Sequence, residues 1–451
     1  MSTTYPILPR QPTLAQLPAE YPSDAQDQIS HLLSSPTLSR LVILDDDPTG
    51  TQTCHDISVL TVWDIPALAS ELRNPASARG FFILTNSRAL PPPEAESLIR
   101  TICQNVAQAA KTTGVAVDIV LRGDSTLRGH FPLEADVAQS VFGEVDAWIL
   151  APFFFQGGRF TIATCIMSRR GRGLFLRVGR FRARRHLRLH SITIEDIRVG
   201  GPQVVCEKLL ALSKDDGGGG MVVIVNAAAE SDMHVFVAGL LLAKAKGKRY
   251  IYRTGAAFVS SRLGIRSKPP ITARDLDLDL GLDLPLARQT GGLILAGSYV
   301  PKTTAQLKIL TDRRGGETNQ LAVIEVKVDE LMASAARAER VVRDVSGVVK
   351  GEDELSSLAI GSKVAEALVG VLQGIEVRPR YIIAKGGITS SDAATKGLRI
   401  QRALVVGQAA AGVPLWRCDE PTSRHRGVPF IVFPGNVGSE STLCELVEAW
   451  S

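Results

Sequence analysis

Three consecutive carboxylates, Asp45, Asp46 and Asp47, follow directly after the apolar run at residues 41–44. This run predicts a buried strand, and the Pro, Thr and Gly after the carboxylates predict that the strand ends there. In open α/β sheets, ligands bind at the carboxyl ends of the strands. Clustered negative charges at such an edge need a cation, a basic residue or a hydroxyl-bearing ligand to offset their repulsion. The alternative is a solvated turn, which Asp and Pro also favour.

A second polar segment, residues 122–130, follows a predicted strand at 116–121. Arg122 or Arg128 could hold a carboxylate through paired hydrogen bonds, while Asp124 could accept a hydrogen bond from a ligand hydroxyl. The alternative is an Arg–Asp pair that only caps the loop. Arg253 ends another predicted strand in the same manner, so it joins the candidate site.

Glycine turns follow three predicted strands in the C-terminal part of the chain. The first begins at Lys385, and the others are Gly297-Ser298 and residues 434–438. Backbone N–H groups in such turns, together with a helix N-terminus, can bind phosphate, and Lys385 could add charge. The same residue types also cap helices without binding a ligand. Because all three turns fall in one region, they could surround one nucleotide.

The elements that would position these residues alternate between helix and strand, which predicts a parallel or mostly parallel sheet with helices on both faces. An acidic low-complexity segment at 271–290 separates two well-patterned regions, and we expect it to be a linker. The sequence therefore predicts two α/β domains with mostly parallel sheets, at 1–270 and 291–451. Further predictions include a strand at 322–326 and a helix at 356–372.

The composition limits the possible classes of protein. Of the 451 residues, 45% are hydrophobic and 22% are charged, which excludes a globally disordered chain. We find no apolar run of membrane-spanning length and no secretory signal, so we expect a cytoplasmic protein without membrane partners. Six cysteines lie scattered, which argues against a metal cluster or a disulfide framework and predicts buried thiols.

Residues 160–190 differ in character, because arginine is frequent there and lysine is absent. Ten arginines fall between Asp146 and Glu195, and without them the net charge of +5 would be −5. One interpretation is an arm that binds nucleic acid. The interpretation we favour is a stretch foreign to the fold, such as a retained intron or a shifted reading frame. It predicts poor packing and no nucleic-acid partner.

These motifs together resemble the four-carbon acid sugar kinase family, whose members phosphorylate threonate, erythronate and oxo-tetronate type acids with ATP. Residues 46–50 resemble the family's Asp-Asp-x-Thr-Gly signature, and residues 124–129 its Asp-Ser-Thr-Leu-Arg-Gly segment. Residues 386–389 and 435–438 resemble its nucleotide loops. Asp45 does not align with the signature. The chain departs from the family pattern at 160–190 and at Ile388, where many members carry an acidic residue.

The resemblance implies an N-terminal domain that binds the acid sugar, a C-terminal domain that binds ATP with Mg²⁺, and catalysis in a cleft between them. A catalytically impaired family member is the alternative, and a homodimer is plausible. The candidate catalytic residues are Asp46, Asp47 and Asp124. The candidate substrate-binding residues are Thr49, Arg122, Ser125, Arg128 and Arg253. The candidate ATP-binding residues are Ser298, Lys385, Gly386, Gly387, Ile388, Thr389, Gly435 and Gly438.

Overall fold

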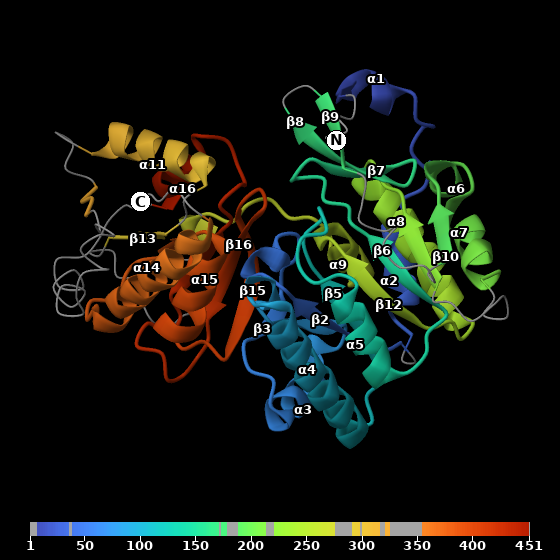
Figure 1. The fold of residues 1–451 in the computed structure, drawn as a ribbon, viewed down its shortest axis with the longest axis horizontal. Coiled ribbons are helices and arrows are strands. Elements are labelled where there is room, and N and C mark those ends of the chain that lie inside the picture. Colours follow the sequence, from blue (N-terminus) through green and yellow to red (C-terminus); the bar gives the residue numbers. More distant parts are fainter. Residues whose placement is uncertain are drawn as a thin grey trace. The chain divides into compact units, whose positions relative to one another are not determined.

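The computed structural model describes residues 7–35, 38–170, 173–177, 188–212, 221–275, 291–297, 300–315, 321–324 and 354–450. The chain forms two compact units, both of the α/β class that the sequence predicts (Figure 1). Unit 1 comprises Met1–Asp46 and Val62–Ser267, and unit 2 comprises Asp47–Thr61 and Lys268–Ser451.

The main sheet of unit 1 is parallel in every described pairing, in the order β10-β11-β6-β12-β5-β2-β4. The strands are β2 (Arg40–Asp45), β4 (Gly80–Leu84), β5 (Val117–Arg122), β6 (Ala147–Ala151), β10 (Arg188–Ile192), β11 (Met221–Val225) and β12 (Tyr250–Thr254). Most of their residues are buried on both sides, as expected for parallel strands covered by helices. The chain goes from β2 to β4 on one side and then to β5 on the other. Open α/β sheets bind ligands where the strand order reverses in this way.

Helices of unit 1 pack in two separate groups, as they do when a sheet lies between two helical layers (Figure 1). One group contains α3 (Ile65–Arg73), α4 (Pro92–Thr113) and α5 (Leu133–Phe142). The other contains α2 (Ala25–Leu32), α6 (Ile194–Arg198), α7 (Gly201–Leu210), α8 (Glu230–Ala245) and α9 (Ala256–Arg262). On α4, buried Ile99, Ile102 and Val106 recur at helical spacing, so one face of this helix lies in the core.

A small antiparallel sheet in unit 1 corrects one prediction. It contains β1 (Ile7–Pro9), β7 (Arg159–Ile162), β8 (Cys165–Arg170) and β9 (Gly173–Arg177). Phe160 is 0% exposed and Met167 is 5% exposed. The prediction that 160–190 packs poorly is therefore wrong for this part, because strand pairing lets its apolar residues reach the core. Residues 171–172 and 178–187 lie outside the described residues.

Unit 2 has a mixed sheet, in the order β3-β15-β16-β17-β14-β13. The strands are β3 (Ile57–Leu60), β13 (Leu293–Ala296), β14 (Ile382–Lys385), β15 (Arg402–Ala410), β16 (Val413–Cys418) and β17 (Pro429–Phe433). β13, β14 and β17 are parallel, whereas β3, β15 and β16 join them through antiparallel pairings. The division of the sequence at residue 270 did not anticipate that residues 47–61 belong to this unit. Their placement depends on the pairing of β3 with β15, a contact between segments far apart in the sequence.

The helices of unit 2 include α11 (Pro301–Arg314), α14 (Glu354–Gly374), α15 (Gly387–Asp392) and α16 (Thr442–Trp450). Trp450 packs edge-on to Tyr381, with ring centroids 5.7 Å apart, inside the core of this unit. The predicted strand at 322–326 is not found over residues 321–324, and its remainder lies outside the described residues. So do residues 276–290 of the predicted linker, although its first residue, Ile271, donates its N–H to Gln408 O at 2.7 Å within unit 2.

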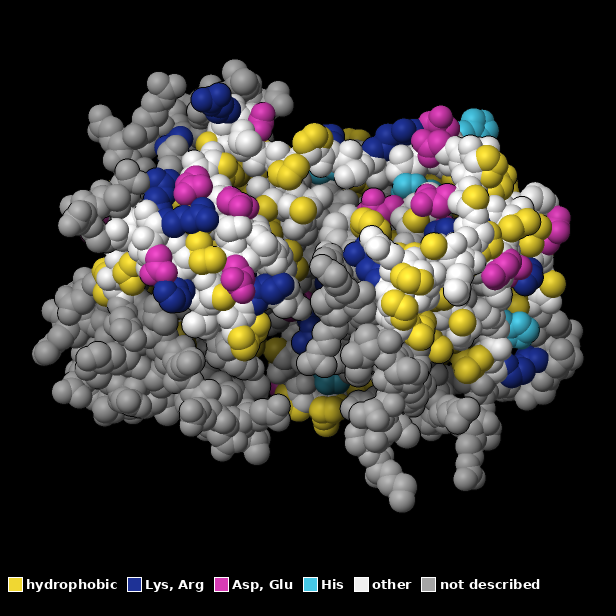
Figure 2. All heavy atoms as spheres, turned by 90° about the horizontal axis from the view of Figure 1, so that it is seen from above, with side chains coloured by type: hydrophobic (Ala, Val, Ile, Leu, Met, Phe, Trp, Pro, Cys, Tyr) yellow, Lys and Arg dark blue, Asp and Glu magenta, His cyan; other side chains and the backbone are white. Residues whose placement is uncertain are grey.

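The surface shown in Figure 2 carries basic and acidic side chains that lie interspersed among the described residues rather than gathered by sign. Within the described part of the chain, no helix combines the length and apolar character needed to span a membrane. All six cysteines are free thiols, and all but Cys165 are buried.

Candidate functional site

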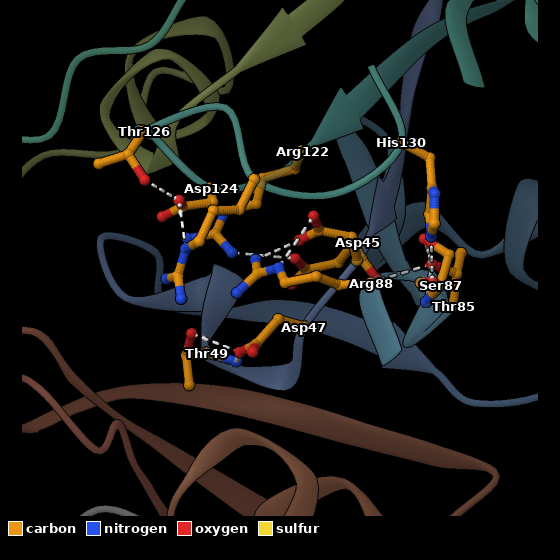
Figure 3. Close-up of polar contacts among 12 residues, drawn as sticks. Asp45, Asp47, Thr49, Thr85, Ser87, Arg88, Arg122, Asp124, Thr126 and His130 are labelled. Atoms are coloured by element: carbon orange, nitrogen blue, oxygen red, sulfur yellow. Dashed lines mark hydrogen bonds and ion pairs between the residues drawn. The ribbon is translucent and has the colours of Figure 1, made fainter. Parts of the chain in front are cut away.

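The carboxyl ends of β2 and β5 carry a buried ion pair. Arg122 Nη1 lies 3.2 Å from Asp45 Oδ1, and the two side chains are 6% and 2% exposed (Figure 3). A buried pair of this kind is costly to break, because either partner left alone would be an uncompensated buried charge. Arg122, the predicted ligand of the substrate carboxylate, is thus engaged with Asp45, the one carboxylate that did not align with the family signature.

The next carboxylate, Asp46, is held by an arginine that the sequence did not single out. Arg88 Nη2 lies 2.5 Å from Asp46 Oδ1, and Arg88 Nε donates to Asp46 Oδ2 at 3.2 Å. Both oxygens are bound by one guanidinium, the most specific form of this interaction. Arg88 lies in the short 3-10 turn Ser87–Ala89, after Asn86 with φ 53°. Polar residues directly after β4 were the available signal, the same signal that identified the other strand ends.

Buried hydrogen bonds fix the turn that carries Arg88. Ser87 Oγ donates to Glu134 Oε1 at 2.7 Å. Thr85 Oγ1 donates to Asp45 O at 3.0 Å (Figure 3). His130 Nε2 lies 3.0 Å from Ser87 O. Burial and the nearby charge of Asp46 raise the pKa of Glu134. The backbone around Arg88 is therefore held on several sides by polar contacts away from water, where they are strong.

Asp124 is an ionised carboxylate in the second polar segment. Arg128 Nε donates to Asp124 Oδ2 at 2.8 Å, and Thr126 Oγ1 also donates to that oxygen (Figure 3). Burial opposes ionisation, but these hydrogen bonds and the charge of Arg128 outweigh it and hold the pKa of Asp124 well below its usual range. Leu127 adopts φ 61° between them, a conformation that bulky side chains rarely take. Ser125 is 7% exposed.

Arg253 lies beneath the same segment. It is 2% exposed, and its Nη2 donates to Arg128 O at 3.2 Å. A Cβ atom on Gly123 would lie 2.3 Å from the Arg253 guanidinium, so only glycine allows this close approach. The structure brings the candidate side chains of unit 1 to the ends of three adjacent strands, β2, β5 and β12. These candidates are Asp46, Arg122, Asp124, Ser125, Arg128 and Arg253.

Asp47 belongs to unit 2, where it caps a short 3-10 turn, Pro48–Thr51. Asp47 Oδ1 accepts from the N–H of Thr49 at 2.9 Å and from its hydroxyl at 2.6 Å. A Cβ atom on Gly387 would lie 2.5 Å from Asp47 Oδ2. Gly387, a candidate ATP-binding residue, therefore lies directly beside this carboxylate. Trp416 Nε1 donates to Thr51 Oγ1 at 3.0 Å and fixes the end of the turn. One residue of the family signature, Asp47, thus lies against the glycine turn that follows β14 in unit 2.

The turn after β14 begins at a glycine with positive φ. Gly386 has φ 110°, and its N–H donates to Phe433 O at 2.9 Å. Thr389 is 6% exposed, and a Cβ atom on Gly297 would lie 2.8 Å from its hydroxyl. Two of the three predicted turns are therefore neighbours. Ile388 is 47% exposed, and Ser298 lies outside the described residues.

Lys385 is enclosed beneath the third turn. Its side chain is 0% exposed, its Nζ donates to Pro434 O at 2.7 Å, and Nζ lies 3.7 Å from the Phe433 ring centroid. Burial, together with the charge of Lys302, lowers the pKa of Lys385 to about 7. Lys385 therefore contacts the backbone of this turn at Pro434, and Gly438 in the same turn has φ 82°.

Each of these two glycine turns contains a glycine with positive φ, Gly386 or Gly438, and glycine turns of this kind can bind phosphate. Among the described residues, no group of three or more His, Cys, Asp or Glu side chains lies close enough to hold a metal ion. Mg²⁺ in nucleotide sites usually takes one or two carboxylates and completes its shell with phosphate oxygens and water. The predicted Mg²⁺ therefore stays a prediction.

Two family models match the sequence. One describes a sugar-binding N-terminal domain and matches residues 41–171 and 178–262. The other describes a nucleotide-binding C-terminal domain and matches residues 293–443. The chain belongs to the four-carbon acid sugar kinase family. The sugar-binding match crosses most of residues 160–190, so this family membership does not support a stretch foreign to the fold.

Solved structures share the fold of this family member. A putative tRNA synthase from Salmonella typhimurium LT2 superposes with a TM-score of 0.62 at 14% identity, covering 91% of this chain and 100% of that chain. A Haemophilus influenzae protein of the DUF1537 family gives a TM-score of 0.54 at 15% identity, covering 90% and 99%. Identities this low establish the fold alone. No curated protein matches the sequence.

Proposed function

We propose that this family member is an ATP-dependent kinase that phosphorylates a hydroxyl group of a four-carbon sugar acid of the threonate, erythronate or 3-oxo-tetronate type. The observation that carries the proposal is the group of paired carboxylates and guanidinium groups where the strand order of unit 1 reverses. This group lies in the domain that matches a sugar-binding model. A hydroxyl-rich anion needs both kinds of partner, because its carboxylate binds arginine and its hydroxyls donate to aspartate.

For the carboxylate of the acid, Arg128 is the best-placed partner. Its side chain is 58% exposed, whereas Arg122 and Arg253 are buried and bound to protein groups. The buried pair of Arg122 and Asp45 would then hold the neighbouring strand ends in place without binding the substrate. For the hydroxyls, Asp124 is suited because its low pKa keeps it ionised, and an ionised carboxylate only accepts hydrogen bonds. Asp46 and Ser125 complete the proposed set in unit 1, and Thr49, which belongs to unit 2, stays a prediction.

For the nucleotide, the proposed contacts are the glycine turns at Gly386–Thr389 and Gly435–Gly438. ATP would supply the phosphoryl group, and Mg²⁺ would offset the charge of its phosphates. Asp47 lies beside Gly387, so this proposed catalytic carboxylate belongs to the unit that carries the glycine turns.

Phosphoryl transfer depends on positioning and on electrostatic stabilisation more than on strong acid–base chemistry. A carboxylate that orients the attacking hydroxyl is therefore sufficient, and Asp46, Asp47 and Asp124 are the candidates. An ionised Asp124 is a weak base, which favours an orienting role over proton abstraction before transfer. The cleft between the domains, the homodimer and the cytoplasmic location stay predictions.

The test measures ADP release by a coupled assay with Mg-ATP and a panel of four-carbon acids that includes threonate and erythronate isomers. We expect turnover with at least one acid, and we expect Asp47→Asn and Asp124→Asn to abolish most of it. Full turnover by both variants would refute the assignment. A three-carbon acid such as glycerate is the control for the chain length of the substrate.

The alternative, a catalytically impaired family member, makes a different prediction. Mg-ATP would raise the melting temperature of the chain by linkage, while no acid in the panel would give ADP release. The departures from the family pattern at 160–190 and at Ile388 are what motivate this alternative. A replacement of Ile388 by Asp would test whether the second departure matters.

A further inference from the structure

The turn between β17 and α16, residues 434–439, is held by side chains from elsewhere in unit 2. Lys385 Nζ donates to Pro434 O at 2.7 Å, and Thr303 Oγ1 donates to Gly435 O at 3.2 Å. Gln306 Nε2 lies 3.1 Å from Val437 O and 2.6 Å from Ser439 O, and Lys302 Nζ lies 3.0 Å from Gly438 O. Five of the six carbonyl groups of the turn therefore accept a hydrogen bond from a side chain.

These four donors come from two elements. Lys302, Thr303 and Gln306 lie in the first two turns of α11, and Lys385 is the last residue of β14. Thr303, Gln306 and Lys385 are each 0% exposed. Burying these polar groups carries a free-energy cost that a purely structural helix contact could avoid with apolar residues. Their arrangement therefore calls for a reason beyond packing.

Peptide geometry supplies that reason. In a trans peptide unit the C=O of one residue and the N–H of the next point in opposite directions. With the carbonyls of Pro434, Gly435 and Val437 bound on the side of α11 and Lys385, the N–H groups of the residues that follow face the other way. Those N–H groups belong to Gly435, Asn436 and Gly438. Among the described residues, none of the three has an acceptor.

We propose that Lys302, Thr303, Gln306 and Lys385 are positioning residues that hold this turn so that its outward N–H groups form a binding nest for a phosphate group of the nucleotide. Successive N–H groups directed to one side make such an anion-binding concavity. The inference rests on the proposed function, and it adds α11 to the nucleotide site, which no family motif included. The positive charge of Lys302, and that of Lys385 when it is protonated, also favour an anion there.

The test compares two threonines that are neighbours on α11. Thr303→Val keeps the shape of the side chain and removes its hydrogen bond, while Thr303→Ser retains the hydroxyl. Thr304→Val is the matched control, because Thr304 is exposed on the same helix turn. Isothermal titration of the full-length chain measures affinity for Mg-ATP and, separately, for adenosine. Gln306→Leu and Lys302→Met remove further donors.

We expect Thr303→Val to weaken Mg-ATP binding roughly threefold to tenfold, as the loss of one hydrogen bond predicts. Gln306→Leu, which loses two, should weaken it roughly tenfold or more. Adenosine affinity should not change, since it has no phosphate. Thr303→Ser and Thr304→Val should bind Mg-ATP as the unaltered chain does, and in the kinase assay the KM for ATP should rise in Thr303→Val while the KM for the acid stays constant.

Unchanged Mg-ATP affinity in Thr303→Val and Lys302→Met would overturn the inference while leaving the kinase proposal intact. An equal loss of ATP and adenosine affinity would also overturn it, because the damage would then extend beyond the turn. If Gln306→Leu does not fold, the other two variants decide. Failure of the unaltered chain to bind Mg-ATP would overturn both the inference and the proposed function.

Discussion

Arg88 binds Asp46 through both carboxylate oxygens, at 2.5 Å and 3.2 Å, and these two residues come from the ends of adjacent strands 42 positions apart in the sequence. Asp46 is one of the two aspartates that match the family signature. The second proposed hydroxyl acceptor, Asp124, is bound by Arg128 through one oxygen, Oδ2, at 2.8 Å. Each proposed hydroxyl acceptor thus has its own guanidinium partner.

Replacing Arg88 by Met should destabilise the chain by roughly 3 kcal/mol, because Asp46 would be a buried charge without its main partner. Urea unfolding measures this change. The double variant Arg88→Met with Asp46→Asn should regain part of the loss, since the uncompensated charge is then removed. Arg73→Met, at an exposed position, is the control. Strictly additive effects in the double variant would show that the pair is not coupled.

The loss of stability caused by Asp124→Asn should depend on pH. The folded-state pKa of Asp124 lies below its unfolded value, so its stabilising contribution is complete above about pH 4 and is lost as the pH falls through the folded value. The stability difference between the unaltered chain and Asp124→Asn should therefore be largest near pH 7 and shrink on acidification. Urea unfolding at pH 7, 5 and 3.5 tests this.

Arg128→Met provides the comparison for that series, because it removes the main cause of the lowered pKa. In its background, Asp124→Asn should have a smaller effect at every pH. A difference that stays constant from pH 7 to 3.5 would contradict the assigned pKa direction.

Lys385→Met should alter the pH dependence of stability above neutral pH. The pKa of Lys385 is about 7 in the folded chain and about 10.4 when unfolded. Between these values the unfolded state binds one more proton, so this lysine makes stability rise with pH by about 1.4 kcal/mol per unit. The Met variant should lose that slope between about pH 7 and pH 9. An unchanged slope in thermal unfolding would refute the prediction.

At neutral pH the same variant should fold at least as well as the unaltered chain, because removing a buried ammonium removes its desolvation cost. Its affinity for Mg-ATP should nevertheless fall, since Pro434 O loses its donor. Lys308→Met, at an exposed position on α11, is the control. A parallel loss of stability and nucleotide affinity would indicate a structural role alone.

Gly387→Ala should displace Asp47. The added Cβ would lie 2.5 Å from Asp47 Oδ2, so the carboxylate must move away from its hydrogen bonds with Thr49. We expect a loss of about 1–3 kcal/mol in stability and a roughly hundredfold loss of turnover, since misplacement of this size disrupts catalytic geometry. Gly291→Ala is the control, because nothing lies within 4 Å of the position that its added Cβ would take. Turnover equal to the control would exclude a role for this contact.

The strands and helices of unit 1 could be predicted from the sequence because their patterns are local. Apolar runs such as residues 41–44 and helical spacing on α4 depend on neighbours within a few turns of chain. The polar residues at strand ends were visible for the same reason. In unit 2, the hairpin of β15 and β16 was missed, since its alternating burial follows from antiparallel pairing that no local run announces.

The sequence by itself determined the α/β class, the family, and most of the side chains gathered at the strand ends, because each is a local pattern or a motif of contiguous residues. Only the tertiary structure decided which charged side chains form pairs and which other residues they contact. It paired Arg122 with Asp45, placed Arg88 on Asp46 and Asp47 beside Gly387, and buried Lys385 under Pro434. Such contacts join residues tens to hundreds of positions apart, and their energies depend on burial, which a linear pattern does not specify.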